Sequence, residues 1–199
     1  HLESTEESLE PISHTDLMVG VFSEPRKTFD EIAKRPLRTS DWLIPLTIIL
    51  LLSIISSFII FTNPQIVNEV KDKQRAKAEK MMDDMVKEGK MSAQQKEEQM
   101  NATEDRLKGI GTVSGSIFQS IAILIFGSLI FFLICGVYFG ISKFFFASED
   151  GQYKGAMIAS ALSGYINVIS IILVAIVSMF MDRSFSDLSA ASILGIDKL

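Results

Sequence analysis

The segment from Gly155 to Met181 contains no charged side chain, and it constrains the fold more than any other feature of the sequence. Its length of about 27 residues exceeds the roughly 20 that an α-helix needs to cross the hydrocarbon core of a bilayer. An apolar, charge-free segment of this length predicts a membrane-spanning helix at residues 155–181. We therefore expect an all-α, multi-pass transmembrane helical bundle.

Small and polar residues recur at helical spacing along this segment and fall on one face: Ala156, Ser160, Ser163, Asn167, Ser170 and Ser178. Bulky residues fill the opposite face: Ile158, Leu162, Ile166, Ile169, Leu173, Ile176 and Phe180. Helices in membranes associate through small residues and interhelical hydrogen bonds. We expect the small face to contact another helix and the bulky face to contact lipid.

Two further segments are apolar enough to cross a bilayer. Residues 42–62 form the first, which begins at Trp42, and residues 112–146 form the second. The second would extend about 50 Å as a helix and the core is only about 30 Å thick, so we expect one tilted helix. It contains a Gly136-x-x-x-Gly140 close-packing motif. Residues 147–154 allow only a tight turn, so this span and 155–181 should be antiparallel neighbours.

Residues 63–111, between the first and second spans, are rich in charges of both signs. They predict an extramembrane helical hairpin, or one long helix kinked at Gly89. Ser92 and Gln95 have the spacing of a capping box that restarts a helix. A stripe of methionines either lies in the seam between two helices or forms an adaptable surface for a partner. It comprises Met81, Met82, Met85, Met91 and Met100.

Residues 1–15 resemble a flexible tail, and residues 16–41 contain an amphipathic helix that begins at Pro25. Six residues are suited to the membrane surface: Arg26, Lys27, Lys34, Arg35, Arg38 and Trp42. The alternative interpretation is that these residues form an ordinary solvent-exposed face of the helix. The cations favour an N-terminus inside the cell, although several basic residues also follow the first span. Residues 182–199 predict a C-terminal amphipathic segment.

Composition narrows the class of function. About half of the residues are hydrophobic, at 48%, and the net charge of −5 argues against a nucleic-acid partner. The single cysteine, Cys135, lies in an apolar run, where a packing role is expected. Both histidines, His1 and His14, precede the first span, and no span carries an acidic or metal-binding cluster. We expect neither an enzyme nor a bound cofactor or metal.

Short motifs along the chain are similar to those of a known family. They are Ser23-Glu24-Pro25 with Phe29 and Ile32, Trp42-Leu43-Ile44-Pro45, and Tyr153-Lys154 followed by Ser160 and Ser163-Gly164-Tyr165. These residues resemble the Yip domain family, small multi-pass proteins similar to Ypt/Rab-GTPase-interacting proteins, and its prokaryotic branch in particular. Where a proline commonly follows the Gly-Tyr pair in the family, Ile166 stands here. The Asp-Leu-Tyr-Gly-Pro signature of the eukaryotic members is absent, so the resemblance does not extend to a GTPase partner.

The resemblance implies five spans, whereas the sequence contains three. Either the chain stops before two further spans, or it is a divergent short form. Together these observations favour a non-enzymatic scaffold or accessory protein of the bacterial cytoplasmic membrane, which binds other membrane proteins, a larger complex or a second copy of itself. The residues expected to pack or bind partners are Gly136, Gly140, Tyr153, Ser160, Ser163, Gly164, Tyr165 and Asn167. The alternative is a transporter or channel subunit whose polar pathway uses Asn167, Tyr165 and Gln119.

Overall fold

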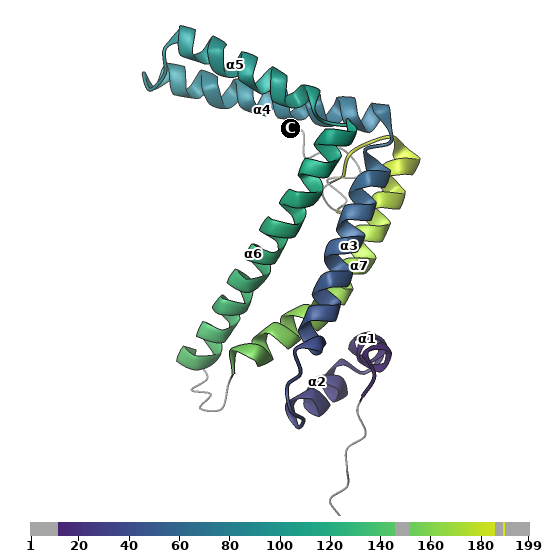
Figure 1. Ribbon diagram of the computed structural model, residues 1–199. Coiled ribbons are helices and arrows are strands. Elements are labelled where there is room, and N and C mark those ends of the chain that lie inside the picture. The colour runs from purple at the N-terminus through teal and green to yellow at the C-terminus, as the bar shows by residue number, and fades with distance from the viewer. Residues whose placement is uncertain (1–11, 146–151, 186–188, 190–199) are drawn as a thin grey trace, which may run out of the picture. The chain divides into compact units, whose positions relative to one another are not determined.

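A computed structural model describes residues 12–145, 152–185 and 189 (Figure 1). The described part of the chain is entirely helical, with seven α-helices and no strand, which confirms the predicted all-α class. The helices are α1 (His14–Ser23), α2 (Pro25–Ala33), α3 (Ser40–Ile60), α4 (Pro64–Lys87), α5 (Ala93–Lys108), α6 (Val113–Phe145) and α7 (Tyr153–Met181). The tail at 1–11, most of the expected turn at 147–154 and most of the C-terminal segment lie outside the described residues.

Three helices, α3, α6 and α7, are long and apolar enough to cross a membrane. Each extends over one of the three segments that the sequence assigns to a span. Helix α3 begins two residues before Trp42, so Pro45 lies inside the helix and not in its first turn. The early start has a local cause, because the Asp41 carboxylate accepts a hydrogen bond from the Arg38 amide at 3.2 Å.

The chain divides into two units, and the three long helices contribute to both of them. The first unit comprises residues 1–47 and 131–166, and the second comprises residues 48–130 and 167–199.

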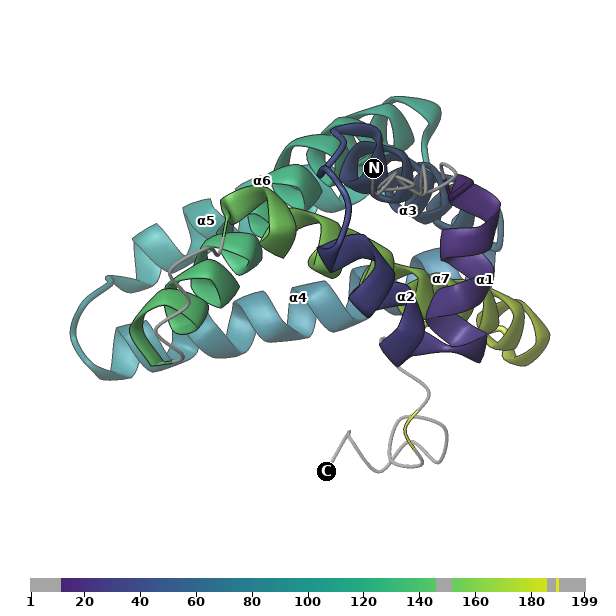
Figure 2. The same ribbon diagram turned by 90° about the horizontal axis from the view of Figure 1, so that it is seen from below.

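The N-terminal segment of the first unit forms two helices where the sequence indicated one. Ser13 caps α1 by accepting from the Asp16 amide at 3.1 Å, and Pro25 occupies the first turn of α2. Close packing of α1 on α2 buries Leu17, Val21 and Ile32 (Figure 2). A side chain at Gly20 would collide with the Thr28 hydroxyl, so the close approach of α1 to α2 requires glycine at this position.

Within the second unit, α4 and α5 pair as a helical hairpin, visible at the end of α3 in Figure 1. The turn contains Gly89 at φ 71°, a left-handed conformation that favours glycine. The predicted capping box is confirmed: Ser92 accepts from the Gln95 amide at 3.1 Å, and the Gln95 side chain accepts from the Ser92 amide at 2.9 Å. The sequence-based alternative of one long kinked helix is therefore wrong.

The methionine stripe lies partly in the seam of this hairpin. Met82 and Met91 are buried, whereas Met81 is exposed. Two ion pairs also join the helices: Arg75 donates to both Glu104 carboxylate oxygens at 2.5 and 2.8 Å, and Lys96 donates to Asp83 at 2.5 Å. The seam interpretation therefore describes most of these methionines better than an exposed partner surface does.

Candidate functional site

A polar groove interrupts the apolar surface of the spans in the second unit. It has a volume of about 470 Å³ and receives side chains from all three long helices. Its polar lining consists of Ser53, Ser56 and Ser57 from α3, Gln119 from α6, Asn167 and Ser170 from α7, and Ser184 beyond α7. Most membrane-spanning surface is apolar, so polar side chains gathered at one place indicate a functional site.

The hydrogen-bonding needs of these side chains are not all met within the helices. Ser53 donates to the Ile49 carbonyl one turn earlier, at 2.8 Å, and so satisfies its own hydroxyl. The exposed amide of Asn167 forms no hydrogen bond with any of the residues that the structure describes. An amide offers two donors and one acceptor, so Asn167 retains its full capacity to bind another group.

Asn167 also lies at mid-depth in its helix. It lies fourteen positions after Tyr153, where α7 starts, and fourteen positions before Met181, where α7 ends. At 1.5 Å per residue, each end is about 21 Å away. An unpaired amide at that depth is costly in hydrocarbon, so it requires a polar partner or water.

Polar contacts tie Ser184, which lines the groove, to helix α4. The Ser184 amide donates to Glu69 Oε2 at 2.7 Å, and Lys73 Nζ donates to the Ser184 carbonyl at 3.2 Å. Asn63 Nδ2 donates to Asp182 Oδ1 at 2.6 Å. These bonds fix the segment after α7 to the first turns of α4, which positions Ser184 at the groove.

The described residues show no group of three or more histidine, cysteine, aspartate or glutamate side chains able to hold a metal ion. The groove contributes hydroxyl and amide groups, which bind by hydrogen bonding. Its arrangement suits recognition of a polar group within the membrane.

Comparison with protein families agrees with this architecture. A model of the Yip1 domain matches residues 19–196, a range that contains all three long helices and the whole groove. The chain belongs to the Yip1 domain family. No curated protein and no solved structure matches it.

The family motif at the start of α7 lies in the first unit of this Yip1 domain and is only partly buried, since Tyr153 and Ser163 are exposed. The Tyr153 hydroxyl donates to the Phe132 carbonyl at 2.7 Å, and its ring meets Phe139 edge-on at 5.7 Å. Gly164 and Tyr165 are both buried. Tyr165 does not line the groove, so it does not share a polar pathway there with Asn167 and Gln119.

The predicted division of α7 into a packing face and a lipid face is wrong in the first unit. Ile158 and Leu162, expected to face lipid, are fully buried at 0% exposure. Ser163, expected to pack, is exposed, and Ser160 is half-buried. Burying a branched aliphatic side chain removes more apolar area than burying serine, so the bulky residues take the contact.

In the second unit the small-face prediction is met only in part. Ser178 is fully buried, and Ile169, Ile176 and Phe180 are exposed as expected for a lipid-facing surface. Asn167 and Ser170, which belong to the small face, are exposed as well. Gly136 and Gly140 on α6 belong to the first unit, and a side-chain carbon added at either would meet nothing within 4 Å. Their close-packing surface is therefore unfilled by the described residues.

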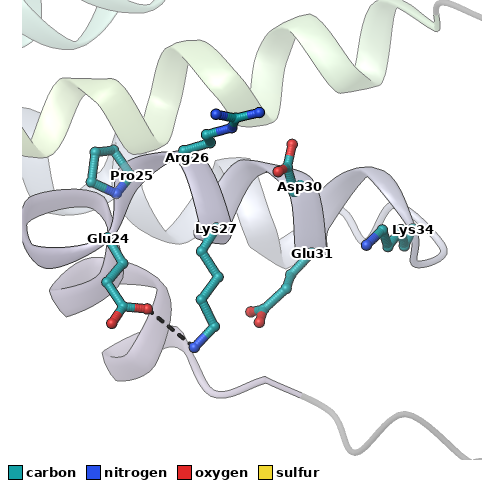
Figure 3. A pocket seen from close by; sticks show the side chains of 7 residues that line it. All are labelled: Glu24, Pro25, Arg26, Lys27, Asp30, Glu31 and Lys34. Atoms are coloured by element: carbon teal, nitrogen blue, oxygen red, sulfur yellow. Dashed lines mark ion pairs between the residues drawn. The ribbon is translucent and has the colours of Figure 1, made fainter.

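The basic face at the N-terminus is mixed in charge. Arg26, Lys27 and Lys34 share a shallow recess with three carboxylates, from Glu24, Asp30 and Glu31 (Figure 3). Lys27 pairs with Glu24 at 3.1 Å, and this hydrogen bond raises the pKa of the Lys27 ammonium. The three cations and three anions cancel, so this recess by itself attracts anionic lipid weakly.

The remaining predicted surface residues separate into exposed and buried ones. Arg38 is exposed, whereas Trp42 is half-buried and stacks on Phe131 at 6.3 Å between ring centroids. The Arg35 side chain is only 9% exposed and lies 3.3 Å from Asp41, whose side chain is 3% exposed. Sequence analysis missed this buried pair, although an arginine and an aspartate six residues apart before an apolar run were its available signal.

Proposed function

We propose that this Yip1 domain protein is a non-enzymatic membrane scaffold that binds a helix of another membrane protein in the polar groove. The unpaired amide of Asn167 at mid-depth in α7 is the observation that carries this proposal. A hydroxyl or amide from the partner helix would satisfy Asn167 and remove the cost of burying it in hydrocarbon. Such interhelical hydrogen bonds contribute about 0.6 to 2 kcal/mol each.

The rest of the groove suits a partner of this kind. Its serines are small enough to allow close approach of a second backbone, and they cluster on one face of α3 at Ser53, Ser56 and Ser57. Ile171 and Val174 from α7 add apolar area beside them. A helix with small residues and a polar side chain opposite Asn167 fits such a surface.

A second association surface is available on α6. Gly136 and Gly140 are four residues apart, and no described residue fills the space above them. Neighbouring side chains on α6, including Leu133 and Val137, are exposed. This face would suit a further partner helix or the same face of a second copy, and the projecting α4–α5 hairpin supplies a charged surface outside the membrane.

The test is partner recovery from native membranes with Asn167→Leu. This variant keeps α7 apolar but removes the hydrogen-bonding groups from the groove, so recovery of the partner should fall. Ser163→Leu is the matched control, because Ser163 is exposed on the same helix and does not line the groove. Undiminished recovery with Asn167→Leu, or an equal loss with Ser163→Leu, would contradict the assignment of the groove as the binding surface.

A transporter or channel subunit is the second candidate, favoured by the meeting of Gln119, Asn167 and Ser184 in one groove. Reconstitution into liposomes separates the two functions. Flux of a substrate or ion that Asn167→Leu abolishes would favour transport. Unchanged permeability, together with loss of the partner, would favour the scaffold.

A further inference from the structure

A second pocket, of about 510 Å³, lies entirely within the first unit and is separate from the groove. It forms between the segment after α2 and the first turns of α7, which lie close together in Figure 2. Phe29, Ile32 and Leu37 belong to its apolar wall, and Arg35, Gln152 and Gly155 are among its other lining residues. One buried cation, Arg35, thus lies in the wall of a pocket with mostly apolar sides.

Arg35 is incompletely paired in this position. Its side chain is more than nine-tenths buried, and neither Nε nor Nη2 forms a hydrogen bond with any described residue. The nearest anion, Asp41 Oδ2, lies 3.3 Å from Nη2 and also accepts from the Arg38 amide at 3.2 Å. Buried guanidinium donors without acceptors are costly, so the site is short of acceptor atoms.

The opposite wall of the pocket also favours an anion. Helix α7 is 29 residues long and begins at Tyr153, directly after Gln152. Its first-turn amides of Gly155 and Ala156 already donate to the Gln152 carbonyl at 2.9 and 3.4 Å. The partial positive charge of the helix end nevertheless remains, and Gln152 and Gly155 place that end at the pocket.

The depth of the site matches that of lipid headgroups. Arg35 precedes α3, a membrane-spanning helix that begins at Ser40, by five residues. A phosphate group presents several acceptor oxygens and pairs with the planar guanidinium through two parallel hydrogen bonds. The apolar wall would contact the glycerol and first methylene groups of a phospholipid.

We propose that this pocket binds the phosphate of an anionic phospholipid, with Arg35 as its principal ligand. The site differs from the exposed basic residues of α2, whose charges are cancelled by neighbouring carboxylates. The pocket has one buried arginine, one helix end and an apolar wall, so it should bind lipid with a defined stoichiometry. A general electrostatic attraction of the protein to the membrane surface would have no such stoichiometry.

The experiment is native mass spectrometry of the full chain in detergent with equal amounts of phosphatidylglycerol and phosphatidylcholine. The protein should retain phosphatidylglycerol preferentially as one tightly bound molecule. Arg35→Gln should lower that preference about ten-fold or more, the size expected for loss of charge-assisted hydrogen bonds. Lys34→Gln is the matched control, because Lys34 is exposed and outside this pocket, and it should keep the preference.

A second variant covers the case in which Arg35→Gln fails to fold. Asp41→Asn keeps Arg35 but removes its nearest anion, so preference for phosphatidylglycerol should rise and the lipid should increase thermal stability more than in the parent. An unchanged preference in Asp41→Asn, or in folded Arg35→Gln, overturns the proposal.

Free phosphate and a lipid headgroup offer Arg35 the same hydrogen-bond acceptors. A further part of the experiment therefore distinguishes binding of free phosphate from binding of lipid. Sodium phosphate is compared with sodium chloride at equal ionic strength on delipidated protein. Stabilisation by phosphatidylglycerol that free phosphate does not reproduce assigns the site to lipid. Stabilisation by free phosphate that requires Arg35, with no lipid preference, overturns the lipid assignment in favour of a soluble anion.

Discussion

Asn63 joins two helices that are distant in the sequence: its Oδ1 accepts from the Gln65 amide at 2.9 Å and caps α4, while its Nδ2 donates to Asp182 Oδ1 at 2.6 Å. Asp182 follows α7 and has a φ of 50°, in the left-handed region. A single amide therefore caps the start of one helix and anchors the end of another. Asp182 lies two residues before Ser184, which lines the polar groove.

Replacing Asn63 with aspartate separates the two roles. Asn63→Asp keeps the capping oxygen but removes the donor and places two carboxylates together, so it should destabilise the protein. Asn63→Ala also removes the cap, at a further cost of about 1 kcal/mol. A double-mutant cycle of Asn63→Ala with Asp182→Ala, read as unfolding free energy in detergent, should give a coupling of about 0.5 to 1.5 kcal/mol. If the losses of unfolding free energy in the two single variants simply add in the double variant, the hydrogen bond contributes nothing to stability.

Two glycines with left-handed backbones provide a matched pair for the second prediction. Gly89 has φ 71° and open space around it, whereas Gly111 has φ 79° and Val67 only 2.8 Å from the position of an added side-chain carbon. Gly89→Ala should cost about 1 to 2 kcal/mol, from backbone strain alone. Gly111→Ala should cost about 1 to 3 kcal/mol more, because Val67 must move.

The difference between the two variants is the informative quantity, measured as unfolding free energy under identical conditions. Val67→Ala introduced with Gly111→Ala should recover part of the loss. Equal destabilisation by the two glycine substitutions would mean that the contact with Val67 relaxes without cost.

The sequence predicted the helices better than it predicted their contacts. A charge-free segment at 155–181, the Ser92–Gln95 capping box and Gly89 are local signals, and the structure has a helix, a cap and a turn there. Helical periodicity shows which residues share a face, but not which face meets a neighbour. The pattern therefore predicts that Ile158 and Leu162 face lipid, whereas both are buried in the structure.

The candidate sites bring together residues that are still farther apart in the sequence. Asn167 stood out as a lone amide in an apolar helix, and the serines of α3 as a small patch. Their meeting in one groove depends on how separate helices pack, which neither segment encodes locally. The Arg35 pocket likewise needs Gln152 and Gly155, more than a hundred residues away in the chain. Sequence patterns thus identified some site residues but not their grouping.

The third prediction concerns the pH dependence of the α4–α5 hairpin. Hydrogen bonding from Arg75 lowers the pKa of Glu104 below its ordinary 4.5, and Lys96 similarly lowers the pKa of Asp83 below 3.8. A carboxylate whose pKa is lowered in the folded state stabilises that state above its unfolded pKa. This contribution should be complete near neutral pH and should disappear as the pH falls below about 4.5.

Hydrogen exchange of α5 amides measures this effect at each pH. Glu104→Gln should speed exchange relative to the parent near neutral pH, and the difference should vanish at low pH, where Glu104 is protonated. Glu97→Gln is the control, because Glu97 is exposed on the same helix and has no ion-pair partner among the described residues. A difference that persists at low pH would assign the effect of Glu104 to something other than its charge.

The fourth prediction concerns orientation in the membrane, where an N-terminus inside the cell is proposed. Basic residues near the cytoplasmic ends of spans favour this orientation, and Lys34, Arg35 and Arg38 precede α3 closely. Five basic residues also follow α3 within α4, namely Lys71, Lys73, Arg75, Lys77 and Lys80. Two of these five basic residues pair with carboxylates, since Lys73 contacts Glu69 and Arg75 contacts Glu104. Acidic residues nevertheless contribute little to the positive-inside rule, so the five basic residues of α4 still count against this orientation.

Single-cysteine labelling in intact cells distinguishes the two orientations. Cys135→Ser removes the one native thiol, and Lys90→Cys or Glu24→Cys then places a thiol on the hairpin turn or between α1 and α2. With the N-terminus inside, a membrane-impermeant maleimide should label Lys90→Cys in intact cells and Glu24→Cys only after lysis. The reverse pattern would place the hairpin inside the cell and make the basic residues of α4 the cytoplasmic determinant. Labelling of both before lysis would contradict a single orientation, because one span separates the two positions.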